Sequence, residues 1–182
     1  MPDLYCSSVA SVPFGKMAQR GIVNICFDLD NTLAERTSWD LDENSLLAVN
    51  DARRNGYIKN ICIVSNIIFG AKRAERVYAA AEQLKTKHCF AARFWERKPG
   101  PRPFMEAMRM MNSEPCSTAI IGDQIFTDIA GGKKLGLYTI LVKPLGGDHW
   151  ATMLTGRRFR EALILQDLKV DSHLELEGAK ML

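Results

Sequence analysis

The chain has 182 residues, the length of about one domain, with 47% hydrophobic and 25% charged residues. These proportions are typical of a globular protein, so they exclude disordered, collagen-like and coiled-coil chains. Twenty-four basic and 21 acidic side chains give a net charge of +3, which is too small to predict binding to nucleic acid.

Residues 1–20 are predicted to form an irregular leader. A signal peptide is not expected, because Asp3, Ser7, Ser8 and Ser11 interrupt any apolar core there. No apolar run in the chain approaches the roughly 20 residues that a membrane helix needs. The five cysteines are widely spaced and include no CxxC pair, which argues against a disulfide framework. We therefore expect a protein of the reducing cytoplasm.

Residues 21–182 are predicted to form a single domain in which short apolar runs alternate with helical stretches. Strands are predicted, in chain order, at 22–27, 61–64, 89–92, 119–121 and 138–142. Helices are predicted at 44–54, 71–85, 102–111 and, near the C-terminus, 158–168. The alternation indicates an α/β fold: an open, doubly wound, Rossmann-like and mostly parallel sheet flanked by helices. Ligands of such sheets bind beyond the carboxyl ends of the strands, so the residues that follow each strand decide the function.

The first predicted strand runs into the sequence DLDNTL at 28–33. If the extended conformation persists, the carboxylates of Asp28 and Asp30 project to the same side and repel each other when both are ionised. A bound divalent cation would relieve that repulsion, and oxygen ligands of this kind suit Mg²⁺. The alternative is an ordinary turn, because Asp and Asn are common turn residues.

Polar side chains also follow the next three strands. Ser65 and Asn66 end the second strand, where they can donate hydrogen bonds to phosphate or cap a helix. Lys98 follows the third strand, as a phosphate clamp or as a solvated surface lysine. The fourth strand leads to Gly122, which permits a close turn, and to Asp123, which by itself also fits a helix N-cap. Acid, hydroxyl, lysine and acid at four successive strand ends make coincidence a poor explanation.

This ordered set resembles the haloacid dehalogenase-like (HAD) phosphatase superfamily. FDLDNTL at 27–33 is similar to its first motif, Ser65 to the second, Lys98 to the third and GDQIFTD at 122–128 to the fourth. Within the superfamily the chain is most similar to the capless subfamily IIIA. There it resembles the YqeG-type group, which includes phosphatidylglycerophosphate phosphatases. The resemblance runs from about residue 21 to about residue 165.

The resemblance implies a role for each matching position. Asp28 would be the nucleophile that forms an aspartyl-phosphate, and Asp30 the general acid and base. Ser65 would hold the transferred phosphoryl group, while Lys98 would steady the nucleophile. Asp123 would bind Mg²⁺ alongside the Asp28 carboxylate and the Asp30 backbone carbonyl. Further expected residues are Asn31 and Asn66 for substrate binding, Thr32 and Gly122 for support, and Asp128 for positioning Lys98 or a metal-bound water.

The motif spacing leaves no room for a cap domain. Asp30 and Ser65 are 35 residues apart, and Ser65 and Lys98 are 33 apart. A crossover helix with its next strand takes about 30 residues, whereas a separate domain would need roughly 50 more. An uncapped site is open to bulky or interfacial substrates unless a neighbouring subunit covers it. We predict Mg²⁺-dependent hydrolysis of a phosphomonoester, with phosphatidylglycerophosphate as the leading substrate.

Two segments would suit peripheral contact with an anionic membrane. Residues 67–69 (Ile-Ile-Phe) either dip into lipid or lie buried under the next helix, and they stand where the group often has a second asparagine. Arg157, Arg158 and Arg160 either meet anionic headgroups or form the solvated side of a terminal helix. One alternative function is a capless, homo-oligomeric phosphatase for a soluble sugar phosphate or a phosphorylated macromolecule. Another is a non-catalytic binding module that keeps the fold and the metal.

Overall fold

The computed structural model of the chain describes residues 1–67 and 71–146. In this part of the chain a six-stranded sheet has the order β1-β6-β5-β2-β3-β4, and every neighbouring pair is parallel. The strands are β1 (Leu4–Cys6), β2 (Asn24–Phe27), β3 (Asn60–Asn66), β4 (His88–Ala92), β5 (Thr118–Gly122) and β6 (Tyr138–Val142). The α-helices are α1 (Phe14–Gln19), α2 (Glu43–Arg54), α3 (Ala71–Gln83), α4 (Arg102–Met111) and α5 (Ala130–Lys134). The predicted doubly wound α/β sheet is confirmed.

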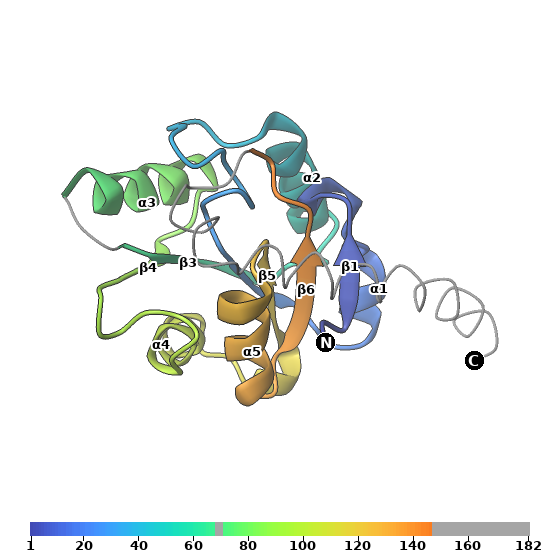
Figure 1. The fold of residues 1–182 in the computed structure, drawn as a ribbon. Helices are drawn as coiled ribbons and strands as arrows, with labels where there is room; N and C mark the ends of the chain where they lie inside the picture. Colours follow the sequence, from blue (N-terminus) through green and yellow to red (C-terminus); the bar gives the residue numbers. More distant parts are fainter. Residues whose placement is uncertain (68–70, 147–182) are drawn as a thin grey trace. The chain divides into compact units, whose positions relative to one another are not determined.

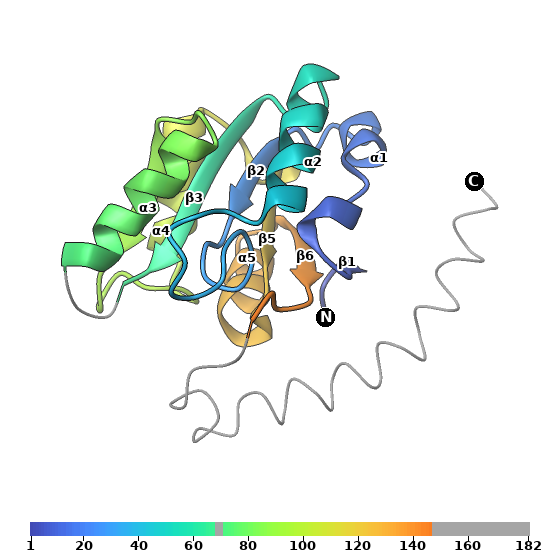
Figure 2. The same cartoon turned by 90° about the horizontal axis from the view of Figure 1, so that it is seen from above.

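Helices cover both faces of the sheet (Figure 1). One face packs against α1, α2 and α3, which contribute Phe14, Val49 and Val77 to a large core cluster. Figure 2 shows these three helices lying over the same side of the strands. The opposite face packs against α4, where Phe104 and Met111 belong to a second, smaller cluster. The central strands are therefore apolar on both faces, as in other parallel sheets.

The elements predicted from residue 21 onwards occur close to their expected positions. The predicted strand at 138–142 and the predicted helix at 102–111 coincide with β6 and α4. A single helix stands in each connection between β2, β3 and β4, so the described residues contain no cap domain. No helix in the described ranges is both long and apolar enough to cross a bilayer. The predicted helix at 158–168, the arginines at 157–160 and residues 68 and 69 lie outside the described residues.

The expectation of an irregular leader over residues 1–20 is wrong. Leu4 pairs with Ile140, so β1 forms an edge strand of the sheet beside β6. Phe14 and Met17 are buried on α1, and Val9 is 1% exposed. The serines and the aspartate that interrupt a signal-peptide core do not prevent these apolar residues from packing onto the sheet. The segment is therefore part of the domain.

We expect Phe14→Ala to lower the free energy of unfolding by about 3 kcal/mol or more, because it removes a buried aromatic side chain and leaves a cavity. Lys16→Ala on the same helix is the control: Lys16 is exposed, so its loss should change stability by under about 0.5 kcal/mol. Urea denaturation measures both. Equal, small effects would show that this segment is not integral to the domain.

Candidate active site

The candidate site lies at the point in the parallel sheet where the order of successive strands reverses. From β2 the chain continues through β3 and β4 on one side, whereas β5 and β6 lie on the other. Phe27 is opposite Ile121 in the register, and the backbone N–H of Asp28 donates a hydrogen bond of 2.9 Å to the Ile121 carbonyl. The residues that follow β2 and β5 are thereby brought together. Ligands of open α/β sheets bind in the crevice at such a reversal.

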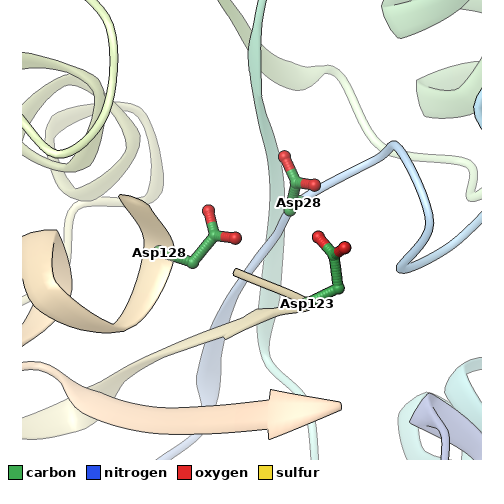
Figure 3. A group of neighbouring side chains, drawn as sticks. All are labelled: Asp28, Asp123 and Asp128. Carbon is green, nitrogen blue, oxygen red and sulfur yellow. The ribbon is translucent and has the colours of Figure 1, made fainter. Parts of the chain in front are cut away.

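Three buried carboxylates meet at this edge of the sheet. Asp28 follows β2, Asp123 follows β5, and Asp128 belongs to a short π-helical segment, Ile125–Ile129. One oxygen from each carboxylate lies within 4.8 Å of those of the other two. Figure 3 shows the three carboxylates gathered around one space. Asp28 and Asp123, predicted to share a metal ion, are thus close enough to do so.

The side chain of Lys98 joins this cluster from the loop between β4 and α4. Its Nζ lies 2.5 Å from Asp28 Oδ1 and 2.6 Å from Asp128 Oδ1, and it donates a hydrogen bond of 2.7 Å to the Val64 carbonyl. The Lys98 side chain is only 2% exposed. The structure therefore places Lys98 against the predicted nucleophile, with Asp128 holding it from the other side.

The site carries an excess of negative charge. Burial raises the pKa of Asp28 well above its usual range, and Asp128 and Asp123 raise it further, although Lys98 opposes them. Burial by itself would lower the pKa of Lys98, but the carboxylates of Asp128 and Asp28 outweigh it and raise that pKa. The ammonium group is therefore charged and contacts two of the three carboxylates. A divalent cation would balance this charge.

The donor set fits Mg²⁺. Carboxylate oxygens are hard ligands, and octahedral coordination at about 2.1 Å sets ligand oxygens roughly 3 to 4 Å apart. One oxygen from each of Asp28, Asp123 and Asp128 lies within 4.8 Å of the other two, so small side-chain adjustments would bring them into this range. Both oxygens of Asp128 are engaged, Oδ1 by Lys98 and Oδ2 by the Gln124 backbone N–H, whereas Lys98 contacts only Oδ1 of Asp28. Asp28 and Asp123 are therefore the better candidates for direct ligands.

Gly122 makes room for the Asp128 carboxyl group. A Cβ atom at residue 122 would lie 2.4 Å from Asp128 Cγ, much closer than such atoms approach in proteins. Asp128 Oδ2 also accepts a hydrogen bond of 3.2 Å from the backbone N–H of Gln124. From the sequence, Gly122 is expected to support the site through a close turn. In the structure the glycine permits close packing of the residue that anchors Lys98.

Ser65 and Asn66 end β3 next to the lysine. Ser65 is 4% exposed and, within the described ranges, its hydroxyl has no hydrogen-bond partner. Asn66 Oδ1 accepts a bond of 2.8 Å from the backbone N–H of Lys98, and Asn66 Nδ2 donates one of 3.1 Å to the Lys98 carbonyl. The predicted substrate contact of Asn66 remains untested. In the structure the Asn66 side chain binds both the N–H and the carbonyl of the Lys98 backbone.

The expected close approach of the Asp28 and Asp30 carboxylates is wrong. Asp30 Oδ1 instead pairs at 2.8 Å with the guanidinium group of Arg76 on α3. Strand β2 ends at Phe27, and the chain then turns through Asn31, whose φ is 62°. Alternation of side chains along a strand therefore does not apply at residue 30. Asp28 has Asp123 and Asp128, not Asp30, as its carboxylate neighbours.

Asn31 and Thr32 are buried within this turn. The Asn31 backbone N–H donates a bond of 2.7 Å to the Ala34 carbonyl, and the Asn31 carbonyl accepts one of 3.0 Å from the N–H of Leu145. Thr32 is 1% exposed. Both residues thus contribute to the shape of the loop beside Asp28, while substrate binding by Asn31 stays a prediction.

Arg76 is a residue of the candidate site that the sequence does not predict. Arg76 is one of several basic residues on a predicted helix, and nothing in the local sequence distinguishes it from a solvent-exposed arginine. Only the tertiary structure shows that this arginine is 9% exposed and paired with Asp30.

Carboxylates and a buried lysine at the switch point of a parallel α/β sheet can bind a divalent cation and a phosphate group. The HAD-hydrolase-like family profile matches residues 95–170. A probable phosphatase of Bacillus subtilis, YqeG, is 31% identical over 179 residues, which cover 97% of this chain and 96% of that protein. The chain belongs to the haloacid dehalogenase-like phosphatases, in agreement with the resemblance of its motifs.

Other comparisons agree on the fold. A putative HAD-like phosphatase from Mesorhizobium loti superposes with a TM-score of 0.53 at 22% identity, covering 71% of this chain and 76% of that one. An uncharacterised protein from Listeria monocytogenes gives 0.54 at 14% identity, covering 70% and 84%. A glyceraldehyde 3-phosphate phosphatase from Pyrococcus furiosus is 27% identical over 92 residues, which span 50% of this chain and 37% of that protein.

We expect Mg²⁺ binding to release protons and to tighten as pH rises above about 4, the usual carboxyl range. The pKa of Asp28 is raised, so in a fraction of the molecules its carboxyl group is protonated above that pH. This group must lose its proton before it binds a cation. Isothermal titration calorimetry in two buffers with different ionisation enthalpies measures the proton release. Asp123→Asn should weaken the binding, and pH-independent binding without proton release would contradict the assignment.

Proposed function

We propose that the protein is a Mg²⁺-dependent phosphomonoesterase that works through an aspartyl-phosphate on Asp28. The observation that carries the proposal is the contact of the Asp28 carboxylate with the buried Lys98 ammonium group beside Asp123 and Asp128. A nucleophile, a fixed positive charge and a set of metal-binding oxygens are then in one place. Phosphoryl transfer depends mainly on such positioning and on electrostatic stabilisation.

In the first half-reaction a carboxylate oxygen of Asp28 attacks phosphorus as the bond from phosphorus to the leaving oxygen breaks. Lys98 holds Oδ1 of Asp28, which leaves Oδ2 for the attack. The Ser65 hydroxyl donates a hydrogen bond to a phosphoryl oxygen, and Asp30 gives a proton to the leaving oxygen. The products are an alcohol and phosphorylated Asp28.

In the second half-reaction water hydrolyses the aspartyl-phosphate. Asp30, now ionised, takes a proton from the water as its oxygen attacks phosphorus, and the bond to Asp28 breaks. Phosphate leaves, and both carboxyl groups return to their starting states. Lys98 is well placed to stabilise the negative charge in both steps, because it is buried and remains charged.

Asp28 and Asp123, together with the backbone carbonyl of Asp30, would hold Mg²⁺, which supplies positive charge to the phosphoryl oxygens when bound. The support for this assignment is the excess of buried negative charge and the spacing of the carboxylate oxygens. It does not rest on the Asp30 carboxylate, which is paired with Arg76.

Asp28→Asn should lower the rate of hydrolysis of an aryl phosphate by at least about a thousandfold, since it removes the nucleophile. Asp51→Asn, which changes an exposed carboxylate on α2, should leave the rate unchanged. Release of the arenol with Mg²⁺ present is the measurement. If the wild-type protein were no more active than Asp28→Asn, the non-catalytic binding module would be favoured instead.

We further propose that the substrate is a lipid phosphate, with phosphatidylglycerophosphate as the leading candidate. The lack of a cap domain among residues 1–67 and 71–146 supports this, because a headgroup at a bilayer surface can reach an uncapped site directly. A second support is the loop between β4 and Lys98, where Trp95 is 84% and Phe94 51% exposed. The two rings meet edge to face at 6.3 Å, and the Arg97 guanidinium lies 4.7 Å from the centre of the Phe94 ring.

Exposed aromatic rings with a neighbouring arginine are typical of protein surfaces that bind the membrane interface. The rings enter the headgroup region, while the positive charge is attracted to anionic lipid at about 1 kcal/mol per charge near the surface. Ile67, by contrast, packs partly buried against the core, which does not favour this residue as a membrane contact. The exposed loop next to Lys98 is therefore the better candidate.

Trp95→Ala should lower the fraction of protein that sediments with anionic liposomes, without changing hydrolysis of a soluble aryl phosphate. Tyr57→Ala, which removes an aromatic ring that is 41% exposed, is the matched control and should not alter sedimentation. Wild-type protein that stays in the supernatant with every lipid would favour a soluble sugar phosphate or a phosphorylated macromolecule. The Pyrococcus relative, named for glyceraldehyde 3-phosphate, supports that alternative, in which a homo-oligomer covers the site.

A further inference from the structure

The guanidinium group of Arg76 makes three hydrogen bonds next to the candidate site. Arg76 NH1 donates one of 2.8 Å to Asp30 Oδ1, Nε donates one of 2.9 Å to the Ser38 carbonyl, and NH2 donates one of 3.2 Å to the Glu35 carbonyl. The residue is 9% exposed and lies on α3. Each of the three nitrogens of the planar group has its own partner.

The two backbone carbonyls fix the orientation of this guanidinium group. They belong to the loop that follows the turn after β2, so Arg76 connects α3 to that loop and to Asp30 at once. A planar group held at two points presents its third nitrogen in one direction. The ion pair therefore determines where the carboxyl group of Asp30 lies.

Only one oxygen of Asp30 is used in this contact. Oδ1 faces Arg76, whereas Oδ2 has no hydrogen-bond or ion-pair partner among residues 1–67 and 71–146. The Asp30 side chain is 14% exposed. Arg76 thus anchors one oxygen and leaves the other available to a bound molecule.

We propose that Arg76 is a positioning residue for the hydrolytic reaction. It holds the Asp30 carboxyl group so that Oδ2 can transfer a proton to the leaving oxygen as the bond from phosphorus to that oxygen breaks. This inference rests on the proposed function, in which Asp30 is the general acid. Arg76 does not contact the reacting atoms and acts through Asp30.

A purely structural role is the rival explanation. A buried ion pair adds little net stability compared with well-packed apolar groups, so stability alone is a weak reason for this arrangement. The two roles differ in one measurable respect. General acid catalysis matters most for a poor leaving group, because an alkoxide needs a proton far more than a stable phenolate does.

The experiment compares glycerol phosphate, an alkyl ester, with dinitrophenyl phosphate, which has a good leaving group. Arg76→Met should lower kcat/KM for the alkyl ester about 10- to 100-fold and for the aryl ester less than about threefold. Arg76→Lys keeps a positive charge beside Asp30 but loses the contacts with the two carbonyls, so it should lower kcat/KM for the alkyl ester by an intermediate factor. Guanidinium at a non-denaturing concentration should partly restore Arg76→Met on the alkyl ester. Lys72→Met, an exposed cation on the same helix, is the control and should change neither rate.

A double-mutant cycle tests whether Arg76 acts through Asp30. In an Asp30→Asn background, Arg76→Met should cause little further loss on the alkyl ester, because the group that it positions is already disabled. Equal losses on both esters, or full additivity of the two substitutions, would overturn the proposal and leave the phosphatase activity of the wild type intact. A wild-type protein that hydrolyses neither ester would overturn the proposed function, and the role of Arg76 with it.

Discussion

A buried ammonium group, Nζ of Lys98, allows three carboxylates to share one edge of the sheet. Without it, Asp28 and Asp128 would be buried next to each other and next to Asp123 with no opposite charge in contact. Burying unpaired charge is costly, and such groups otherwise take up protons. Even with Lys98 present, the pKa of Asp28 is raised by burial and by its carboxylate neighbours. The negative charge of the site is therefore balanced only in part, which leaves the site suited to a cation.

Several backbone features hold this arrangement in place. Asn66 holds the Lys98 backbone in both directions, at its N–H and at its carbonyl. Gly122 leaves space for the Asp128 carboxyl group, which reaches Lys98 from the opposite side. These residues come from β3, from the end of β5 and from the segment beyond it. The charges can meet because parallel strands place their carboxyl ends at one edge.

The order of motifs along the chain was enough to predict the sheet and the convergence of its strand ends. Asp28 and Asp123 could be placed near each other because both directly follow buried strands of a parallel sheet. Asp30 could not be placed, since its orientation depends on a turn with a left-handed residue and on an arginine from α3. That contact spans 46 residues, and nothing local to either residue signals it. Strand β1 was not predicted for a similar reason. Its three residues are too few to show a hydrophobic pattern, and only pairing with β6 identifies them as a strand.

Arg76 links α3 to the loop that follows β2, in a connection that contains no cap domain among the described residues. Many enzymes hold a reacting side chain in place by closing a lid over the site. Here the connection between β2 and β3 is a loop followed by α2, and a residue of α3 in the same domain holds the loop at 35–38. Arg76 does this by binding the Glu35 and Ser38 carbonyls with the same group that binds Asp30. In the proposed mechanism a helix of the same domain thus orients the general acid, and the described residues place no cap domain over the site.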